Sequence, residues 1–266
     1  MKKIICLLFC LGGLCAGALA TDVVKAVSPD GNLVMDLSLR DGSPVYTLSY
    51  KGSPVVLESA LGLNGNSDWS RGLALEGVET ASYDRSWKPI YGERSVIPDR
   101  YNLYRATFGG LKDKDRNHLK LELEIRAYDE GMAFRYRFLE GGGYLHIDRE
   151  YTEYTLPEGT WAYHTPLAQT EYAKLPLKEW PTEAERPLVL ELPDGLYLCL
   201  TEAGVVDYAR TKFALSDGKP NTVVSSMYGA VDEIAPFDTP WRVMMVAEQP
   251  GQLLEHNYLI LNLNPP

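Results

Sequence analysis

The sequence predicts an all-β protein, a large antiparallel β-sandwich. Along most of its 266 residues apolar and polar residues alternate, and this period of two is typical of strands with one buried face. Short segments rich in Gly, Asp, Asn and Pro separate the alternating runs, as hairpin turns do. No convincing helix of about ten residues or more and no alternation of strands with helices is present, which argues against a parallel sheet. The length suits one large domain.

The start of the chain has the organisation of a signal peptide. Lys2 and Lys3 form a basic beginning, residues 4–14 are almost entirely apolar, and Ala18-Leu19-Ala20 fits a small-residue cleavage site. The apolar run is short for a bilayer span, so no transmembrane segment is expected. We therefore predict a signal peptide over residues 1–20 and export of the domain, to the periplasm.

The predicted domain, residues 21–266, is acidic and poor in cysteine. Without the two leader lysines it has 24 basic and 36 acidic residues, a net charge of about −12, which disfavours nucleic acid and anionic membranes as partners. Of the four cysteines only Cys199 lies beyond the leader, so no internal disulfide is expected. In an alternative interpretation the protein is a lipoprotein anchored through Cys15.

Alternation identifies the individual strands. In chain order, the clearest are residues 35–40, 119–127, 134–138 and 196–200. In the second of these, Lys120, Glu122, Glu124 and Arg126 alternate with apolar residues, so one face should be buried and the other charged. Apolar residues at 258–261 are expected to lie near a last strand.

Six segments between the strands supply residues that tolerate a positive φ. They are residues 29–32, 40–43, 51–54, 129–131, 193–195 and 216–219. Several adjacent strands should therefore form antiparallel hairpins. The three glycines at 141–143 fit a hairpin tip or a flexible joint, because their spacing matches no nucleotide-binding motif.

Familiar catalytic and metal motifs are not recognisable. The chain has no Gly-x-Ser-x-Gly elbow, and its four histidines are scattered singly without zinc-ligand spacing. Glu150, Glu153 and Glu158 are close in sequence, but no spacing requires two of them to meet as an acid–base pair.

The segment 166–172, between two β-rich halves, is the best functional candidate. Two nearby prolines keep it from continuing as a strand or helix. It offers one carboxylate, Glu171, beside Gln169 and Tyr172. Acid–base hydrolysis needs a second group across the substrate, so this carboxylate alone is a poor catalyst. It is better suited to donate one oxygen to a site that other residues complete.

Aromatic residues give a second set of candidates, because flat rings stack on the apolar faces of pyranose sugars. Trp87 and Tyr91, beside Glu93, occupy a loop-like segment. Aromatic residues also dominate cores and interfaces, and we favour that interpretation for these two. Trp161 and His164 lie close to the Glu171 loop, where His164 is a candidate to face a ligand.

Eight short segments, taken in order, carry a resemblance that covers essentially the whole domain. They are SPDGNL (28–33), SWKPIYGE (86–93), DEGMAFRY (129–136), QTEY (169–172), DGLY (194–197), VDY (206–208), TPWR (239–242) and LNLNP (261–265). Together they resemble the amino-terminal domain of glycoside hydrolase family 97, secreted α-glucosidases and α-galactosidases typical of Bacteroidetes.

The resemblance implies a β-super-sandwich similar to galactose mutarotase. In that family a central (β/α)₈ barrel carries the catalytic carboxylates and most ligands of a calcium ion, and the sandwich lends one glutamate. The matching residue is Glu171, which the resemblance makes a Ca²⁺ ligand. A barrel needs about 250 residues, and the resemblance to the sandwich already takes up residues 28–265 of the 266. No catalytic residue is therefore assigned, and a catalytic barrel is expected to be encoded elsewhere or lost.

A partner barrel would leave an apolar contact surface on this chain. Trp87, Tyr91, Trp161 and Trp241 are the candidates for it, and Arg242 is a further candidate to contact the barrel or an α-linked glucoside or galactoside. Two alternatives remain open. One is a stand-alone carbohydrate-binding module of a polysaccharide-utilisation system; the other, ranked last because the histidines do not pair, is a mutarotase.

Overall fold

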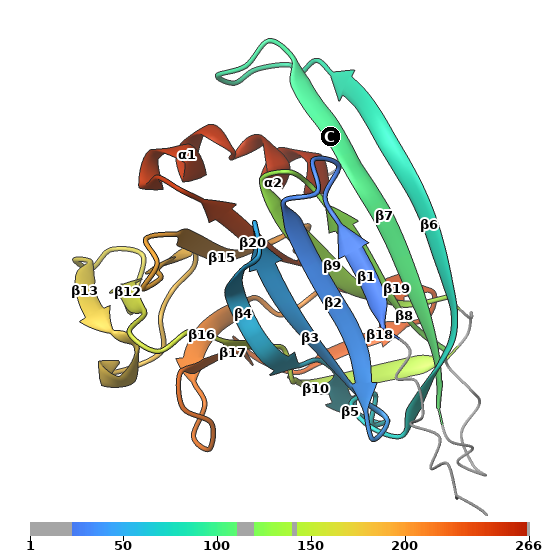
Figure 1. Ribbon diagram of the computed structural model, residues 1–266. Coiled ribbons are helices and arrows are strands. Elements are labelled where there is room, and N and C mark those ends of the chain that lie inside the picture. Colours follow the sequence, from blue (N-terminus) through green and yellow to red (C-terminus); the bar gives the residue numbers. More distant parts are fainter. Residues whose placement is uncertain (1–22, 111–119, 140–142, 265–266) are drawn as a thin grey trace, which may run out of the picture.

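The described residues of the domain form two large antiparallel sheets, one small sheet and two short α-helices (Figure 1). This computed structural model describes residues 23–110, 120–139 and 143–264. The predicted leader and the proposed acylation site at Cys15 lie outside the described residues. No helix in the described part is both long and apolar enough to cross a membrane.

The first sheet has seven strands. Their spatial order is β1 (Val24–Val27), β2 (Leu33–Arg40), β3 (Ser43–Tyr50), β4 (Ser53–Ala60), β11 (Glu153–Thr155), β17 (Thr222–Met227) and β16 (Thr211–Leu215). The first four form a meander, and the last three come from later in the chain.

The second sheet has ten strands and is the longer of the two. Nine follow in the order β13 (Ala173–Pro176), β12 (Trp161–His164), β14 (Leu188–Glu191), β15 (Tyr197–Ala203), β20 (Trp241–Ala247), β9 (Gly131–Phe138), β8 (Leu121–Ala127), β7 (Ile97–Gly110) and β6 (Leu73–Trp87), and β19 (Phe237–Asp238) also pairs with β9. The β6–β7 hairpin extends well beyond the rest of the sheet (Figure 1).

The remaining elements are short. A third sheet contains β18 (Val231–Ile234), β10 (Tyr144–Glu150) and β5 (Leu63–Gly65). A 3₁₀ turn, η1 (Leu177–Glu179), follows β13, and α1 (Pro250–Glu255) and α2 (Tyr258–Leu263) follow β20.

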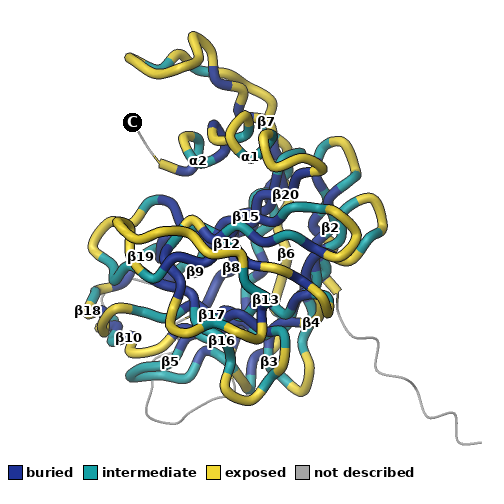
Figure 2. The backbone as a smooth tube through the Cα atoms, turned by 90° about the vertical axis from the view of Figure 1, so that its left-hand side faces the viewer, coloured by how far each residue is buried: buried dark blue, intermediate teal, exposed yellow. Residues whose placement is uncertain are grey.

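Alternating side chains build the main core between the sheets. Leu33, Met35 and Leu37 of β2 are buried, and so are Leu121, Leu123 and Ile125 of β8. Each such side chain removed from water stabilises the fold by about 1.5–3 kcal/mol. Figure 2 shows this burial running through the body, while the β6–β7 tip is exposed. The expected all-β sandwich is confirmed.

Local turn chemistry accounts for the hairpins. Asp41 and Gly42 between β2 and β3 have φ of 51° and 78°, and Lys51 and Gly52 between β3 and β4 have 49° and 84°. Two consecutive positive φ values match the twist of the flanking strands. All six predicted turns connect strands that pair antiparallel, so that expectation is confirmed.

One expectation from the pattern is wrong. The segment 258–261 belongs to the helix α2, whose Leu259 and Leu263 pack on the outer face of the ten-stranded sheet, against Val243 and Met245 of β20. A short apolar run fits a strand or a helix equally well, and in this segment packing against the sheet favours the helix. Gly141 and Gly142 of the triple glycine lie outside the described residues, and the strands on either side of it, β9 and β10, belong to different sheets.

Candidate functional site

The Glu171 loop joins β12 to β13 at the edge of the ten-stranded sheet. His164 pairs with Ala173, so residues 165–172 connect the two strands of a short hairpin. They form neither helix nor strand, as predicted. Gln169, Glu171 and Tyr172 are exposed. The loop lies on the side of the molecule that faces the viewer in Figure 2, near the labels of β12 and β13.

The Glu171 carboxylate is uncommitted. No residue in the described ranges forms a hydrogen bond or ion pair with it, whereas most other carboxylates near β12 and β13 are paired. Within those ranges no group of three His, Cys, Asp or Glu side chains is placed to hold a metal ion. The carboxylate is thus an accessible oxygen donor that would need ligands from another source.

Trp161 and His164, from the same hairpin, face opposite ways. Trp161 is 41% exposed, and the Lys174 Nζ lies 5.7 Å from its ring centroid. His164 is buried: its Nε2 lies 3.0 Å from the Thr182 carbonyl, and its ring packs against Trp180. The expectation that His164 faces a ligand is therefore wrong in this structure, since the strand alternation turns it into the core.

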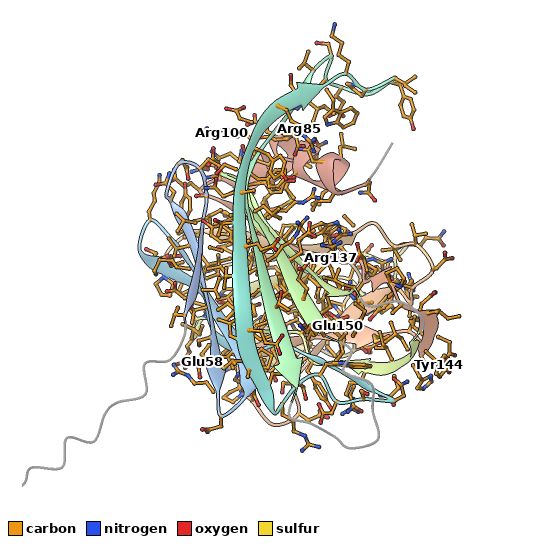
Figure 3. All side chains as sticks on the ribbon, turned by 90° about the vertical axis from the view of Figure 1, so that its right-hand side faces the viewer. Glu58, Arg85, Arg100, Arg137, Tyr144 and Glu150 are labelled. Carbon is orange, nitrogen blue, oxygen red and sulfur yellow. The ribbon has the colours of Figure 1, made fainter. Side chains whose placement is uncertain are left out.

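Arg242 lies inside the sandwich, in an ion cluster with Glu150 and Glu202. Its guanidinium donates to the Glu150 carboxylate at 2.7 and 2.5 Å and to Glu202 at 2.8 Å. Desolvation alone would lower the Arg242 pKa, but the two carboxylates raise it well above its ordinary value. Figure 3 shows Glu150 within the body of the domain. Arg242 is 2% exposed, so a direct contact with a sugar or a second domain is excluded in this structure.

Trp241 is also buried, on the opposite face of β20. It is 4% exposed and belongs to the cluster beneath α2. The guanidinium carbons of Arg126 and Arg135 lie 4.7 and 4.5 Å from its ring centroid, and each such cation–π contact stabilises by about 0.5–2 kcal/mol. Trp241 was expected on an open interface; instead it supports the packing of the sheet with α2.

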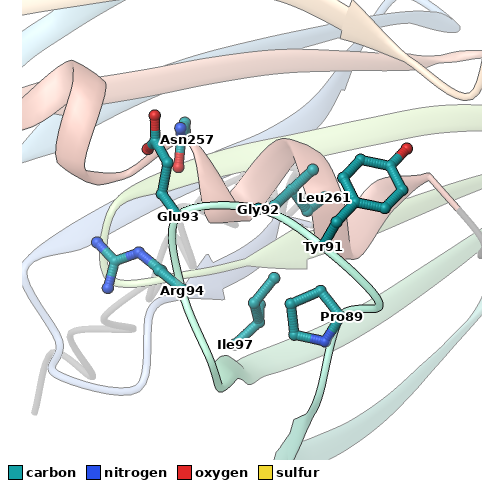
Figure 4. Close-up of a pocket in the computed structure, with 8 residues that line it drawn as sticks. All are labelled: Pro89, Tyr91, Gly92, Glu93, Arg94, Ile97, Asn257 and Leu261. Carbon is teal, nitrogen blue, oxygen red and sulfur yellow. The ribbon is translucent and has the colours of Figure 1, made fainter.

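Trp87, Tyr91 and Glu93 lie at the β6–β7 tip. Tyr91 and Glu93 line a pocket of about 210 Å³ between the tip and α2, together with Pro89, Gly92, Arg94, Ile97, Asn257 and Leu261 (Figure 4). Trp87 is half-buried and donates from Nε1 to Asn262 Oδ1 at 2.8 Å, which fastens the hairpin to α2. Ile90 is 98% and Tyr91 89% exposed, so the tip presents apolar surface to solvent.

The predicted residues therefore form two separate surfaces and an interior set. Trp161, Gln169, Glu171 and Tyr172 share the β12–β13 hairpin, while Trp87, Tyr91 and Glu93 share the β6–β7 tip. His164, Trp241 and Arg242 are interior. Sequence reasoning missed the partners of Arg242. Glu150 and Glu202 lie on strands remote from it in sequence, and no local spacing predicts that they contact it.

Comparison with known proteins decides the family. The family model for the glycosyl-hydrolase 97 N-terminal domain matches residues 26–266. The chain belongs to this family. The resemblance inferred from the eight short segments is thereby confirmed.

The curated relatives of this family 97 domain are glycosidases. It is 25% identical over 288 aligned residues to the retaining alpha-galactosidase of Bacteroides thetaiotaomicron, covering 100% of this chain and 40% of that enzyme. It is 24% identical to a probable retaining alpha-galactosidase of Streptomyces bingchenggensis, covering 80% of this chain and 33% of that enzyme. The chain thus spans about 40% or less of these relatives.

Solved structures of the family have the same fold. A glycoside hydrolase family 97 enzyme of a Pseudoalteromonas species, determined with panose and with acarbose, is 26% identical and superposes with a TM-score of 0.84. The match covers 91% of the family 97 domain described here and 38% of that enzyme. A beta-arabinopyranosidase at 22% identity and a TM-score of 0.76 shares the fold.

Proposed function

We propose that this family 97 domain packs on a catalytic (β/α)₈ barrel and lends it one calcium ligand, the carboxylate of Glu171. The uncommitted, exposed state of that carboxylate is the observation that carries the proposal. Calcium takes six to eight oxygen ligands, including carboxylates, so the donor has the right chemistry and one such donor is not sufficient. The other ligands would come from the barrel. When bound, the ion supplies positive charge beside a substrate.

The β6–β7 tip is the proposed second contact with the barrel. Its exposed Ile90 and Tyr91 form apolar surface of the kind that marks an interaction site, and Leu261 of α2 extends it across the pocket. The proposed substrates are α-linked glucosides or galactosides, because the curated relatives are named alpha-galactosidases and a solved relative was determined with panose and with acarbose. The leader-like residues 1–20 support export to the periplasm; sequencing the amino terminus of the periplasmic protein tests this.

A chimeric protein, called the joined enzyme, tests the calcium role. In it, this chain replaces the matching segment of the Bacteroides thetaiotaomicron alpha-galactosidase, and hydrolysis of p-nitrophenyl α-galactoside is measured against calcium concentration. Glu171→Gln should raise the calcium requirement at least about tenfold, as expected when a ligand carboxylate loses its charge. Glu158→Gln, at another exposed glutamate, is the matched control and should change nothing.

The domain alone should not hydrolyse glycosides. Purified protein is assayed on p-nitrophenyl α-glucoside and α-galactoside with calcium. Appreciable turnover would contradict the supporting role. The alternative of a stand-alone carbohydrate-binding module draws support from Trp161, which is 41% exposed; calorimetric titration with maltotriose, with Trp161→Ala as control, distinguishes it.

A further inference from the structure

The Glu171 loop is attached to the sandwich through two backbone carbonyls at its start. The Thr165 carbonyl accepts a hydrogen bond from the Glu185 backbone N–H at 2.7 Å. The Pro166 carbonyl accepts one from the Lys212 ammonium at 2.8 Å. A bond from a charged donor is stronger than a neutral one, so the Lys212 contact is the firmer of the two.

A second set of hydrogen bonds carries this attachment through the loop. The Thr165 and Thr170 hydroxyls form a hydrogen bond of 2.7 Å with each other, and their oxygens lie 2.9 and 2.8 Å from the Leu167 carbonyl oxygen, to which one of them donates. The Thr170 backbone N–H also donates to that carbonyl, at 3.1 Å. Thr170 precedes Glu171 directly. Thr170, the residue before Glu171, is therefore hydrogen-bonded to Leu167. Leu167 directly follows Pro166, whose carbonyl binds Lys212.

Lys212 is itself held in place. It lies on β16 and is 8% exposed, and its Nζ is 3.9 Å from Glu185 Oε2. The backbone bridge between Ala184 and Phe213 brings these two side chains together. Arg186 and Arg210 donate to the Glu185 carboxylate at 3.1 and 3.3 Å, which fixes the carboxylate. The ammonium is thus confined between a carboxylate and the loop.

We propose that Lys212 is a positioning residue for Glu171: by holding the Pro166 carbonyl, it fixes the loop so that the carboxylate is presented in one arrangement. The purpose of that arrangement rests on the proposed calcium role, whereas the attachment itself does not. Exposed loops otherwise sample open conformations at little cost. A ligand that is already ordered loses less conformational entropy when it binds.

Hydrogen exchange of the whole protein without added metal tests the attachment. Lys212→Met keeps the length of the side chain and removes the donor. The hydrogen-bonded amides of Leu167 and Thr170 should exchange about tenfold faster or more, the effect of losing one charge-assisted hydrogen bond. Lys212→Arg should restore slow exchange, because a charged donor returns. Lys174→Met is the control: Lys174 lies on the same hairpin but binds Glu191, so its removal should leave the exchange rates of the loop unchanged.

Two outcomes of the exchange experiment would overturn the proposal. One is unchanged exchange of the loop in Lys212→Met. The other is equal acceleration in β2, β3 and β4, because that result would show general destabilisation rather than loss of a local attachment.

Calcium dependence in the joined enzyme separates this inference from the proposed function. Lys212→Met should raise the calcium requirement less than Glu171→Gln does, and Lys212→Arg should recover it. If Lys212→Met leaves the requirement unchanged while Glu171→Gln raises it, the positioning role is wrong and the calcium role stands. If Glu171→Gln has no effect, the calcium role is wrong, and loop exchange alone decides whether Lys212 orders the loop.

Discussion

The Arg242 guanidinium and the Glu150 carboxylate form a two-bond ion pair inside the sandwich, with N–O distances of 2.7 and 2.5 Å. Glu202 binds the same guanidinium from the neighbouring strand at 2.8 Å. Thr152 donates to Glu150 and Thr211 to Glu202, at 2.6 and 3.0 Å, so the carboxylate oxygens have further partners. This cluster connects β10, β15 and β20, which belong to two different sheets.

Replacing Arg242 by Met should destabilise the domain strongly. The variant leaves Glu150 buried without a cation, whereas Glu202 keeps Arg186 at 2.5 Å. An uncompensated buried charge typically costs about 3–5 kcal/mol. Urea denaturation measures the free energy of unfolding. Arg40→Met is the control, because the Arg40–Glu58 pair is exposed and should contribute about 1 kcal/mol or less. A loss below about 1 kcal/mol for Arg242→Met would show that the cluster is not structural.

Glu124 should make the stability depend on acid pH. Burial opposes its ionisation, but the guanidinium groups of Arg135, Arg137, Arg126 and Arg105 outweigh burial and lower its pKa below the ordinary 4.5. A lowered carboxyl pKa stabilises the fold above the unfolded value, and the gain disappears as pH falls through the folded value. The difference in unfolding free energy between wild type and Glu124→Gln should therefore shrink below about pH 4.5.

Glu122, on the same face of β8, has a pKa shift of the opposite sign to that of Glu124. Desolvation outweighs Arg137 and raises the pKa of this carboxyl. Its ionisation therefore costs stability as pH rises above the unfolded value. Urea denaturation from about pH 3 to pH 7 should show the advantage of wild type over Glu122→Gln decreasing toward neutral pH, and a parallel trend for both variants would contradict this assignment.

The β6–β7 tip should matter for association and little for folding. Ile90→Asp changes a side chain that is 98% exposed, so the unfolding free energy should change by about 0.5 kcal/mol or less. If the tip contacts the barrel, the joined enzyme should lose specific activity, because a charge would enter an apolar contact. Leu57→Asp, on β4 of the other sheet, is the control; equal losses in both variants would argue against the tip.

Cys199 should be inert in the folded protein. Burial raises the pKa of its thiol to about 12, so almost no reactive thiolate exists at neutral pH. Protein produced without residues 1–20 should fail to react with Ellman's reagent at pH 8 and should react once unfolded in urea. Rapid reaction before unfolding would show that β15 opens locally.

The sequence predicts best those features whose causes are local. Asp41-Gly42 and Lys51-Gly52 specify hairpins through their own φ angles, and alternation specifies which face of β2 is buried. The exposed loop at Glu171 was likewise predictable, because prolines and polar residues interrupt the strands around it.

Features that depend on remote strands were not predictable. The charged face of β8 is covered: Glu122 and Glu124 are 5% and 1% exposed, since arginines of β7 and β9 surround them. A period of two reveals that a face is charged, but not whether neighbouring strands neutralise that charge. The same holds for Lys212, whose role depends on a carbonyl contributed by the distant Pro166.

The long hairpin has a consequence for how copies of this protein meet one another. In the described part of the chain, β6 ends the ten-stranded sheet, and its outer backbone groups have no neighbouring strand. Such an edge is a template for uncontrolled sheet extension and aggregation. Glu76, Glu79 and Asp84 place charged side chains along it, paired with Lys120, Arg105 and Arg100 respectively. Two copies aligned edge to edge would have to bury these charged side chains, so the edge resists self-association.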